Sequence, residues 1–273
     1  MGLEDHLGDI LAKARAMSGV SRAAAARAAG LSEAELADLE ATGRASKRPN
    51  YDPLAALVGL DAAKLETIAA GWVPEPVDVS RWRQLRVLTG DEGGMAVNSF
   101  LVWDESSREA ALFDTGWSAV AAFELIQAHA LVLRHLCITH GHRDHMAAVE
   151  SVLARFPGAR MHRGAATDKV GTDAANGRAL SVGCLRVKAL ATPGHAPDGV
   201  TYVVSGWPGG APAVAFVGDA LFAGSMGRGN QSWSLARQAA RECILSLPPE
   251  TLICPGHGPL TTVAQERAHN PFF

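Results

Sequence analysis

The chain has 273 residues, 48% of them hydrophobic, which is enough to bury a full core and excludes an intrinsically disordered protein. The formal net charge of -3 gives no general attraction for nucleic acid or for an anionic membrane surface. No apolar run is long enough to cross a bilayer, and the N-terminus has early acidic residues, so we expect a cytoplasmic protein without a membrane partner. The four cysteines form no CxxC pair, and we expect buried free thiols.

The first seventy or so residues predict five short helices. Ser32 with Glu35 three residues later is a capping box, and further start signals are Ser21, Asp52-Pro53 and Asp61. Glycines at 30, 59 and 71 end three of these helices. Apolar positions that recur at helical spacing predict a small core of Leu7, Ile10, Leu11, Leu31, Leu36, Leu39, Leu54, Leu57, Leu65 and Ile68.

A change of pattern after residue 72 predicts two domains. Residues 1–72 form an all-α domain, residues 73–82 contain two prolines and form a linker, and residues 83–273 form an α/β domain. The α/β part alternates short β-rich runs with helices near residues 118–129 and after Asp144, Ser232 and Thr261. Strands are expected in LRVLTG, VNSFLVW, AALFDTG, LRHLCITH, LRVKALA, VTYVVSG, AVAFVGD and TLICPGH.

The motif THGHRDH, residues 139–145, gathers three imidazoles and a carboxylate directly after an expected strand. His140 and His142 are one residue apart, so in an extended backbone both side chains point the same way and can share a metal ion. Asp144 and His145 lie at the start of the following helix and can face a second ion. One loop therefore predicts ligands for two metals.

Three further candidate ligands, His195, Asp219 and His257, each follow an apolar run. If the strands align in one sheet, their ends bring these side chains to the same edge. Imidazoles with carboxylates suit zinc, iron or manganese, and a set without cysteine indicates an open site that admits water. The remaining histidines are interpreted as ordinary surface or core residues, namely His6, His129, His135, His162 and His269.

From about Arg83 to the C-terminus the chain resembles the metallo-β-lactamase superfamily, because THGHRDH matches its HxHxDH signature. The resemblance implies an αββα sandwich and two divalent metal ions, with zinc expected and iron or manganese as alternatives. It implies that Asp219 bridges the metals and that the other ligands divide into His140, His142 and His195 for the first metal and Asp144, His145 and His257 for the second. LFAGSMGRG and the C-terminal PGHGPL are similar to glyoxalase II-like hydrolases.

This resemblance implies a hydrolase that attacks a thioester or related acyl substrate with a metal-activated hydroxide. Asp144 and Asp219 are the expected catalytic residues, and Asp219 would orient the water and carry protons. Asp114 is expected to fix the tautomer of a ligand histidine, and Arg228 to meet a substrate carboxylate. The alternatives are an iron enzyme like the persulfide dioxygenases, a lactonase, and a DNA-binding regulator with a metal-binding sensor domain.

The segments SRAAAARAAG, LSEAELADLE and ATGR resemble the helix-turn-helix of Xre-type repressors, over about residues 5–71. The expected recognition helix, which starts at Ser32, contains Glu33, Glu35, Asp38 and Glu40 but no lysine or arginine, so it would repel DNA phosphates. Residues 1–75 contain eight lysines and arginines against eleven acidic residues and carry the whole net charge of the chain. We therefore expect this module to form a homodimer or to cover the active site rather than to bind DNA.

Overall fold

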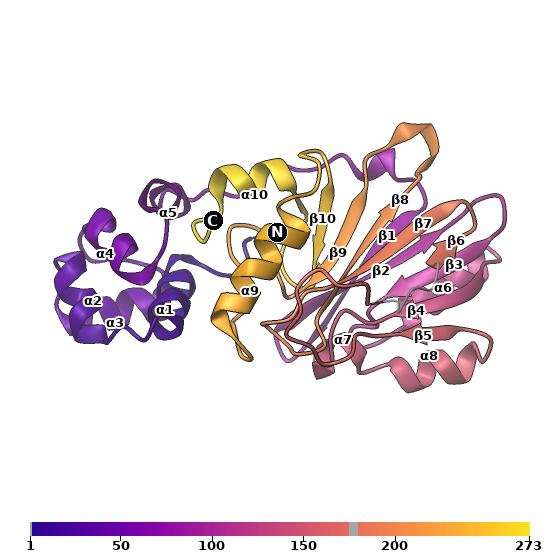
Figure 1. The fold of residues 1–273 in the computed structure, drawn as a ribbon, viewed down its shortest axis with the longest axis horizontal. Helices are drawn as coiled ribbons and strands as arrows, with labels where there is room; N and C mark the ends of the chain where they lie inside the picture. The colour runs from indigo at the N-terminus through magenta and orange to yellow at the C-terminus, as the bar shows by residue number, and fades with distance from the viewer. Residues whose placement is uncertain (1, 175–179) are drawn as a thin grey trace.

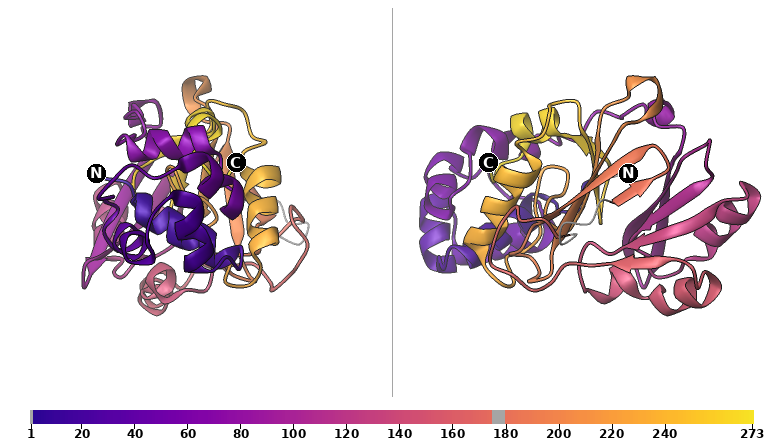
Figure 2. Two further views of the ribbon diagram at one scale, coloured as in Figure 1. Left: turned by 90° about the vertical axis from the view of Figure 1, so that its left-hand side faces the viewer. Right: turned by 45° about the vertical axis from the view of Figure 1, so that its right-hand side comes forward.

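The computed structural model describes residues 2–174 and 180–273. Two β-sheets face each other, helices cover their outer faces, and a group of five helices lies at one end of the molecule (Figure 1). Figure 2 shows this helical end from the front and, in its second view, the two sheets side by side. The mixed α/β class and the sandwich expected from the sequence are confirmed.

The first sheet has strand order β1-β2-β3-β4-β5. β1 to β3 are antiparallel neighbours, whereas β3, β4 and β5 run parallel. Helices α6 and α8 lie on its outer face, and a short helix α7 follows β4 (Figure 1). The bounds are β1 Leu85–Glu92, β2 Met95–Trp103, β3 Glu109–Phe113, β4 Val132–Cys137, β5 Arg160–His162, α6 Val120–Ala128, α7 Arg143–Met146 and α8 Val149–Arg155.

The second sheet has strand order β11-β10-β9-β8-β7-β6, with β9 and β10 parallel and the other pairs antiparallel. Helices α9 and α10 cover its outer face, and a π-helical turn, η3, extends α9. The bounds are β6 Leu180–Val182, β7 Leu185–Ala191, β8 Val200–Ser205, β9 Val214–Gly218, β10 Leu252–Pro255, β11 Thr261–Thr262, α9 Trp233–Ala239, η3 Ala240–Ile244 and α10 Val263–His269; short 3-10 turns are η1 Val79–Arg81 and η2 Pro208–Gly210.

Strand β2 illustrates how the sandwich buries both faces of a sheet. Side chains alternate along a strand, so Phe100 and Val102 point into the core between the sheets while Leu101 and Trp103 pack under the helices. All four are buried, which explains why this strand is a nearly continuous apolar run.

The five N-terminal helices largely follow their predicted signals. Ser21, Ser32 and Asp61 are N-caps whose side chains accept backbone hydrogen bonds, as expected. The fourth helix starts at Tyr51, earlier than the predicted Asp52, because Asn50 occupies the N-cap position. The bounds are α1 Leu7–Met17, α2 Arg22–Ala29, α3 Glu33–Thr42, α4 Tyr51–Val58 and α5 Ala62–Ala69.

Two expectations about burial are wrong. Leu57 is 41% exposed, because it lies on the outer side of α4, whereas the other predicted apolar positions of this module are buried. Cys184 is also exposed, since it lies in the turn between β6 and β7 and its thiol donates to Asp104. The other three cysteines are buried free thiols.

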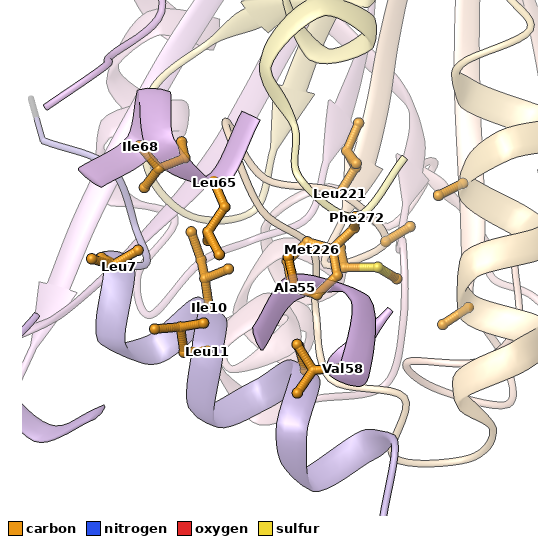
Figure 3. Close-up of a cluster of buried hydrophobic side chains, with 14 of the residues drawn as sticks. Leu7, Ile10, Leu11, Ala55, Val58, Leu65, Ile68, Leu221, Met226 and Phe272 are labelled. Atoms are coloured by element: carbon orange, nitrogen blue, oxygen red, sulfur yellow. The ribbon is translucent and has the colours of Figure 1, made fainter. Parts of the chain in front are cut away.

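The helical module does not have a core of its own. Its buried leucines and isoleucines pack with Leu221, Met226 and Phe272 of the α/β part in a single cluster (Figure 3). Backbone contacts add to this, as Asp61 N donates to Pro271 O. The boundary at residue 72 therefore stays a prediction from the sequence pattern. Among the described helices, none is long and apolar enough to span a membrane.

Candidate metal centre

The candidate ligands lie where strands from both sheets end at one edge of the sandwich. The motif that begins at Thr139 follows β4, while His195, Asp219 and His257 follow β7, β9 and β10. β9 and β10 are parallel, and β7 runs in the same direction because β8 is antiparallel to both β7 and β9. All seven predicted ligands are brought together here.

The first group of donors comprises His140, His142, His195 and Asp219, whose ligand atoms lie within 4.8 Å of one another. His142 Nδ1 lies 2.9 Å from His140 Nε2 and 3.0 Å from His195 Nε2. Three ring nitrogens that converge in this way cannot all be satisfied by protons shared among themselves, whereas one cation can accept a lone pair from each.

The second group comprises Asp144, His145 and His257. Asp144 Oδ2 lies 3.1 Å from His257 Nε2 and 3.5 Å from His145 Nε2. His145 is fully buried, and His257 is nearly so. These two imidazoles and one carboxylate could therefore hold a second cation.

Asp219 lies between the two groups and offers one oxygen to each. Its Oδ1 lies 3.1 Å from His145 Nε2 and 3.6 Å from His257 Nε2. Its Oδ2 lies 3.4 Å from His195 Nε2 and 4.0 Å from His140 Nε2. This is the geometry that a bridging carboxylate needs.

The second ring nitrogen of several ligands has an oxygen partner that fixes the orientation of the ring. His257 Nδ1 lies 2.6 Å from Ala96 O, and His195 Nδ1 lies 2.9 Å from Arg228 O. A carbonyl oxygen accepts only, so Nδ1 carries the proton in each ring and Nε2 is left with its lone pair. Both Nε2 atoms point toward Asp219.

Asp114 contacts both the ligand loop and the candidate ligand His145. It follows β3, is 2% exposed and has a left-handed backbone with φ 54°, a conformation that aspartate tolerates better than most residues. Its Oδ1 accepts from Thr139 N at 2.7 Å, and its Oδ2 accepts from Thr139 Oγ1 at 2.7 Å and contacts His145 Nδ1 at 2.8 Å. The carboxylate thus joins β3 to the ligand loop and orients His145.

The pKa values of the histidines in this centre are shifted in opposite directions. Burial lowers the pKa of His140 to about 2 and also lowers that of His195. Burial opposes the charged form of His145 as well, but Asp219 and Asp114 raise its pKa well above the ordinary value. His140 and His195 are therefore neutral imidazoles, ready to donate lone pairs.

The carboxylates are held in their ionised form. Burial alone would raise the pKa of Asp219, but nearby histidines, His145 first, hold it well below its usual range. Burial would raise the pKa of Asp144, but the hydrogen bond with His257 and the charge of His145 together lower it. Burial would lower the pKa of His257, but the hydrogen bond with Asp144 and the charge of Asp219 together raise it to about 9. A bound cation would replace the protons on these histidines and would balance the negative charge of the carboxylates.

Two observations show that the residues fit metal ions. His145 Nε2 and Asp219 Oδ1 are buried 3.1 Å apart, and neither makes a hydrogen bond of good geometry in the described part of the chain, although buried polar atoms usually do. Gly256 lets the backbone pass close to this point, because a Cβ there would lie 2.6 Å from Asp219 Oδ1. The centre therefore has both unused donor atoms and space kept free around them.

A cavity of about 320 Å³ opens beside the centre and reaches His195, Asp219 and His257. The predicted substrate residue Arg228 lines it with an exposed side chain. Four residues that sequence reasoning missed line the same cavity from the N-terminal segment, namely Glu4, Asp5, Asp9 and Lys13. No local pattern could have found them, because they meet the site through contacts more than 200 residues apart in sequence.

The histidines interpreted as ordinary residues lie outside both donor groups. His6 caps α1, His129 packs against Trp103, and His269 stacks on Trp72. His135 and His162 contact each other at 3.0 Å across β4 and β5.

Comparisons with known proteins agree with this geometry. Residues 93–257 match the family model of the metallo-beta-lactamase superfamily. A probable metallo-hydrolase, YqgX of Bacillus subtilis, is 30% identical over 219 residues, covering 70% of this chain and 97% of its own. The hydroxyacylglutathione hydrolase GloC of Haemophilus influenzae is 28% identical over 64% of this chain and 92% of its own. Mouse mitochondrial persulfide dioxygenase ETHE1 is 30% identical over 63% and 70%.

Solved structures give the same result. The B3 metallo-beta-lactamase BLEG-1 superposes with a TM-score of 0.57 at 27% identity, covering 68% of this chain and 99% of its own. TTHA1623, solved in a di-iron-bound form, has a TM-score of 0.54 at 27% identity and covers 68% and 100%. The fold, the two donor groups and the family match lead to one conclusion: the chain belongs to the metallo-beta-lactamase superfamily.

Proposed function

We propose that the protein is a dinuclear metal-dependent hydrolase that cleaves a thioester or a related acyl substrate. The observation that carries the proposal is the position of Asp219, whose two oxygens face different donor groups. A bridging carboxylate is useful only where two ions lie close together, as in two-metal hydrolytic sites. The likeness to a protein solved with two irons supports the same nuclearity.

The chain's own residues would share the work in a definite way. His140, His142 and His195 would hold one metal and Asp144, His145 and His257 the other, with Asp219 between them. Divalent metal ions supply Lewis acidity, which lowers the pKa of a coordinated water to about 7. The ionised Asp144 and Asp219 would orient that water, because their lowered pKa values keep both carboxylates available as hydrogen-bond acceptors.

The thioester assignment rests on relatives and on the loop that follows β9. A relative named hydroxyacylglutathione hydrolase aligns over most of its own length. LFAGSMGRG, the glyoxalase II-like segment, lies at the centre, where Gly227 N donates to Asp219 O and Arg228 O contacts His195. The exposed Arg228 guanidinium in the cavity would meet a substrate carboxylate.

A second candidate function is persulfide oxidation at a single iron, favoured by the 30% identity to a persulfide dioxygenase. Zinc is the metal expected for the hydrolase, with iron or manganese as alternatives, because histidine and carboxylate ligands accept all three. A lactonase would use the same metal chemistry on a cyclic ester. The three functions are separated by metal content, oxygen uptake and products.

The test is to assay the purified protein, loaded separately with zinc, iron or manganese, on S-lactoylglutathione, on a homoserine lactone and on glutathione persulfide. We expect thiol release from the thioester in at least one two-metal form, without oxygen uptake. Oxygen consumption on the persulfide with one iron per chain would replace the proposal by the dioxygenase. Hydrolysis of the lactone alone would replace it by the lactonase.

A further inference from the structure

The N-terminal segment that precedes and begins α1 forms part of the wall of the catalytic cavity. Glu4, Asp9 and Lys13 line the cavity together with His195, Asp219 and His257. Glu4 also packs on the ligand loop, since a Cβ on Gly258 would lie 3.1 Å from Glu4 Cβ. The helical module thus reaches the site and is not confined to the far end of the molecule.

Buried polar contacts hold this segment in place. Lys13 is 5% exposed, and its Nζ donates to Asp5 Oδ2 and to Met226 O, both at 2.5 Å. Asp5 Oδ2 also accepts from Ser225 Oγ. Met226 and Ser225 belong to the loop between β9 and α9 that also carries Arg228, so these contacts join the segment to this loop.

The charges along this wall leave one carboxylate available to a ligand. Asp5 and Lys13 neutralise each other, and Asp9 accepts from His6 N in the capping box of α1. The carboxylate of Glu4 makes no hydrogen bond or ion pair within residues 2–174 and 180–273, and it interacts electrostatically with His257, Asp5, Asp219 and Lys13. An unpaired carboxylate next to a metal centre attracts a cationic group and repels an anionic one.

Building on the proposed function, we propose that Glu4 is a specificity-determining residue that favours, on its own side of the cavity, a cationic substrate group over an anionic one, while Arg228 would meet a carboxylate elsewhere on the substrate. Glu4, which would select the charge of this substrate group, lies outside residues 93–257, the segment that matches the family model. The module would then act as a fixed part of the substrate site, in agreement with the expectation that it covers the active site.

Three small thiols test this without turnover. Thiocholine, 2-mercaptoethanol and 2-mercaptoethanesulfonate share a two-carbon linker between the thiol and a terminal cationic, neutral or anionic group, and their thiolates bind a metal centre such as zinc. Calorimetry with the zinc-loaded full chain gives the ratio of thiocholine to sulfonate affinity. We expect Glu4→Gln to lower this ratio about fivefold, the effect of about 1 kcal/mol for a partly exposed charge, and Glu4→Lys to lower it further.

The matched control is Asp38→Asn, an exposed acidic position on α3 that does not line the cavity and should leave the ratio unchanged. A ratio unaffected by Glu4→Gln, or a change equal to that of the control, would overturn the assignment of Glu4. Absence of binding by all three thiols would overturn it too, because the cavity would then not open on the metals. Failure of the hydrolase proposal is distinguishable, since it appears as thiol binding with the expected ratio but no thioester cleavage.

Discussion

Replacing Asp114 by asparagine tests whether this carboxylate orients the ligand His145, because the variant should still fold. The amide keeps the size of the carboxylate but has one acceptor oxygen in place of two. If that oxygen stays on Thr139 N, the NH2 group faces His145 Nδ1. His145 must then carry its proton on Nε2, the atom that faces Asp219, and cannot donate a lone pair to a metal. In the opposite orientation, the buried Thr139 N–H is left without an acceptor.

Both orientations have measurable consequences. Loss of a charge-assisted hydrogen bond at a site that is 2% exposed lowers the free energy of unfolding by about 2 kcal/mol. Loss of the partner that orients a ligand histidine typically lowers metal affinity or activity by about 10- to 100-fold. We therefore expect Asp114→Asn to fold, to bind zinc about 10- to 100-fold more weakly at the second donor group, and to lose activity in proportion.

The assays are urea unfolding with a chelator present and competition for zinc against a chromogenic chelator. The matched control is Asp104→Asn, because Asp104 is also a buried carboxylate that accepts a backbone hydrogen bond, from Ser107 N at 2.8 Å, but lies outside both donor groups. The control should lose stability and keep its zinc affinity. Unchanged zinc affinity in Asp114→Asn would refute the reasoning.

Three further predictions concern residues that are not candidate metal ligands. Burial raises the pKa of Glu266 from 4.5 to about 7, so between these pH values the folded state binds more protons than the unfolded state. The free energy of unfolding should therefore fall by about 3 kcal/mol as the pH rises through this range. Urea unfolding at pH 4.5 and 8 should show a smaller fall in Glu266→Gln, and an equal fall would contradict the assignment. Lys13→Met leaves Asp5 without its buried partner and should lower the unfolding free energy by about 3 kcal/mol and raise KM, whereas wild-type values for both would speak against a structural role for this contact. The full chain should show no salt-dependent binding to duplex DNA in fluorescence anisotropy, since Lys47 and Arg48, in the loop between α3 and α4, already pair with Glu35 and Glu66. Binding that weakens steeply with salt would restore the regulator hypothesis.

The features that the sequence predicts correctly are those with a local physical cause. Ser32 and Glu35 form the expected capping box because both partners lie within one helical turn. THGHRDH lies between a strand and a helix, as expected, because the apolar run before it ends where the histidines begin. The glyoxalase II-like and superfamily resemblance adds the sandwich, which the two sheets confirm.

What the sequence could not predict depends on contacts between distant segments. The edge strands β5, β6 and β11 have three residues or fewer, too short for an alternating pattern to be recognised. Lys13 reads as an ordinary helix-surface lysine, yet it is buried through an acceptor 213 residues away. The common core with Phe272 was equally hidden, since helical periodicity shows which side of a helix is apolar but not what covers it.

The central claim is that this chain holds two metal ions bridged by Asp219. Plasma mass spectrometry of the zinc-reconstituted protein, paired with hydrolysis of S-lactoylglutathione, tests it most directly. The account predicts about two metal ions per chain and turnover in the wild type, about one ion in His142→Ala, and loss of both turnover and the second equivalent in Asp219→Ala. A single ion in the wild type, unchanged in Asp219→Ala, or a protein that binds no metal at all, would contradict it.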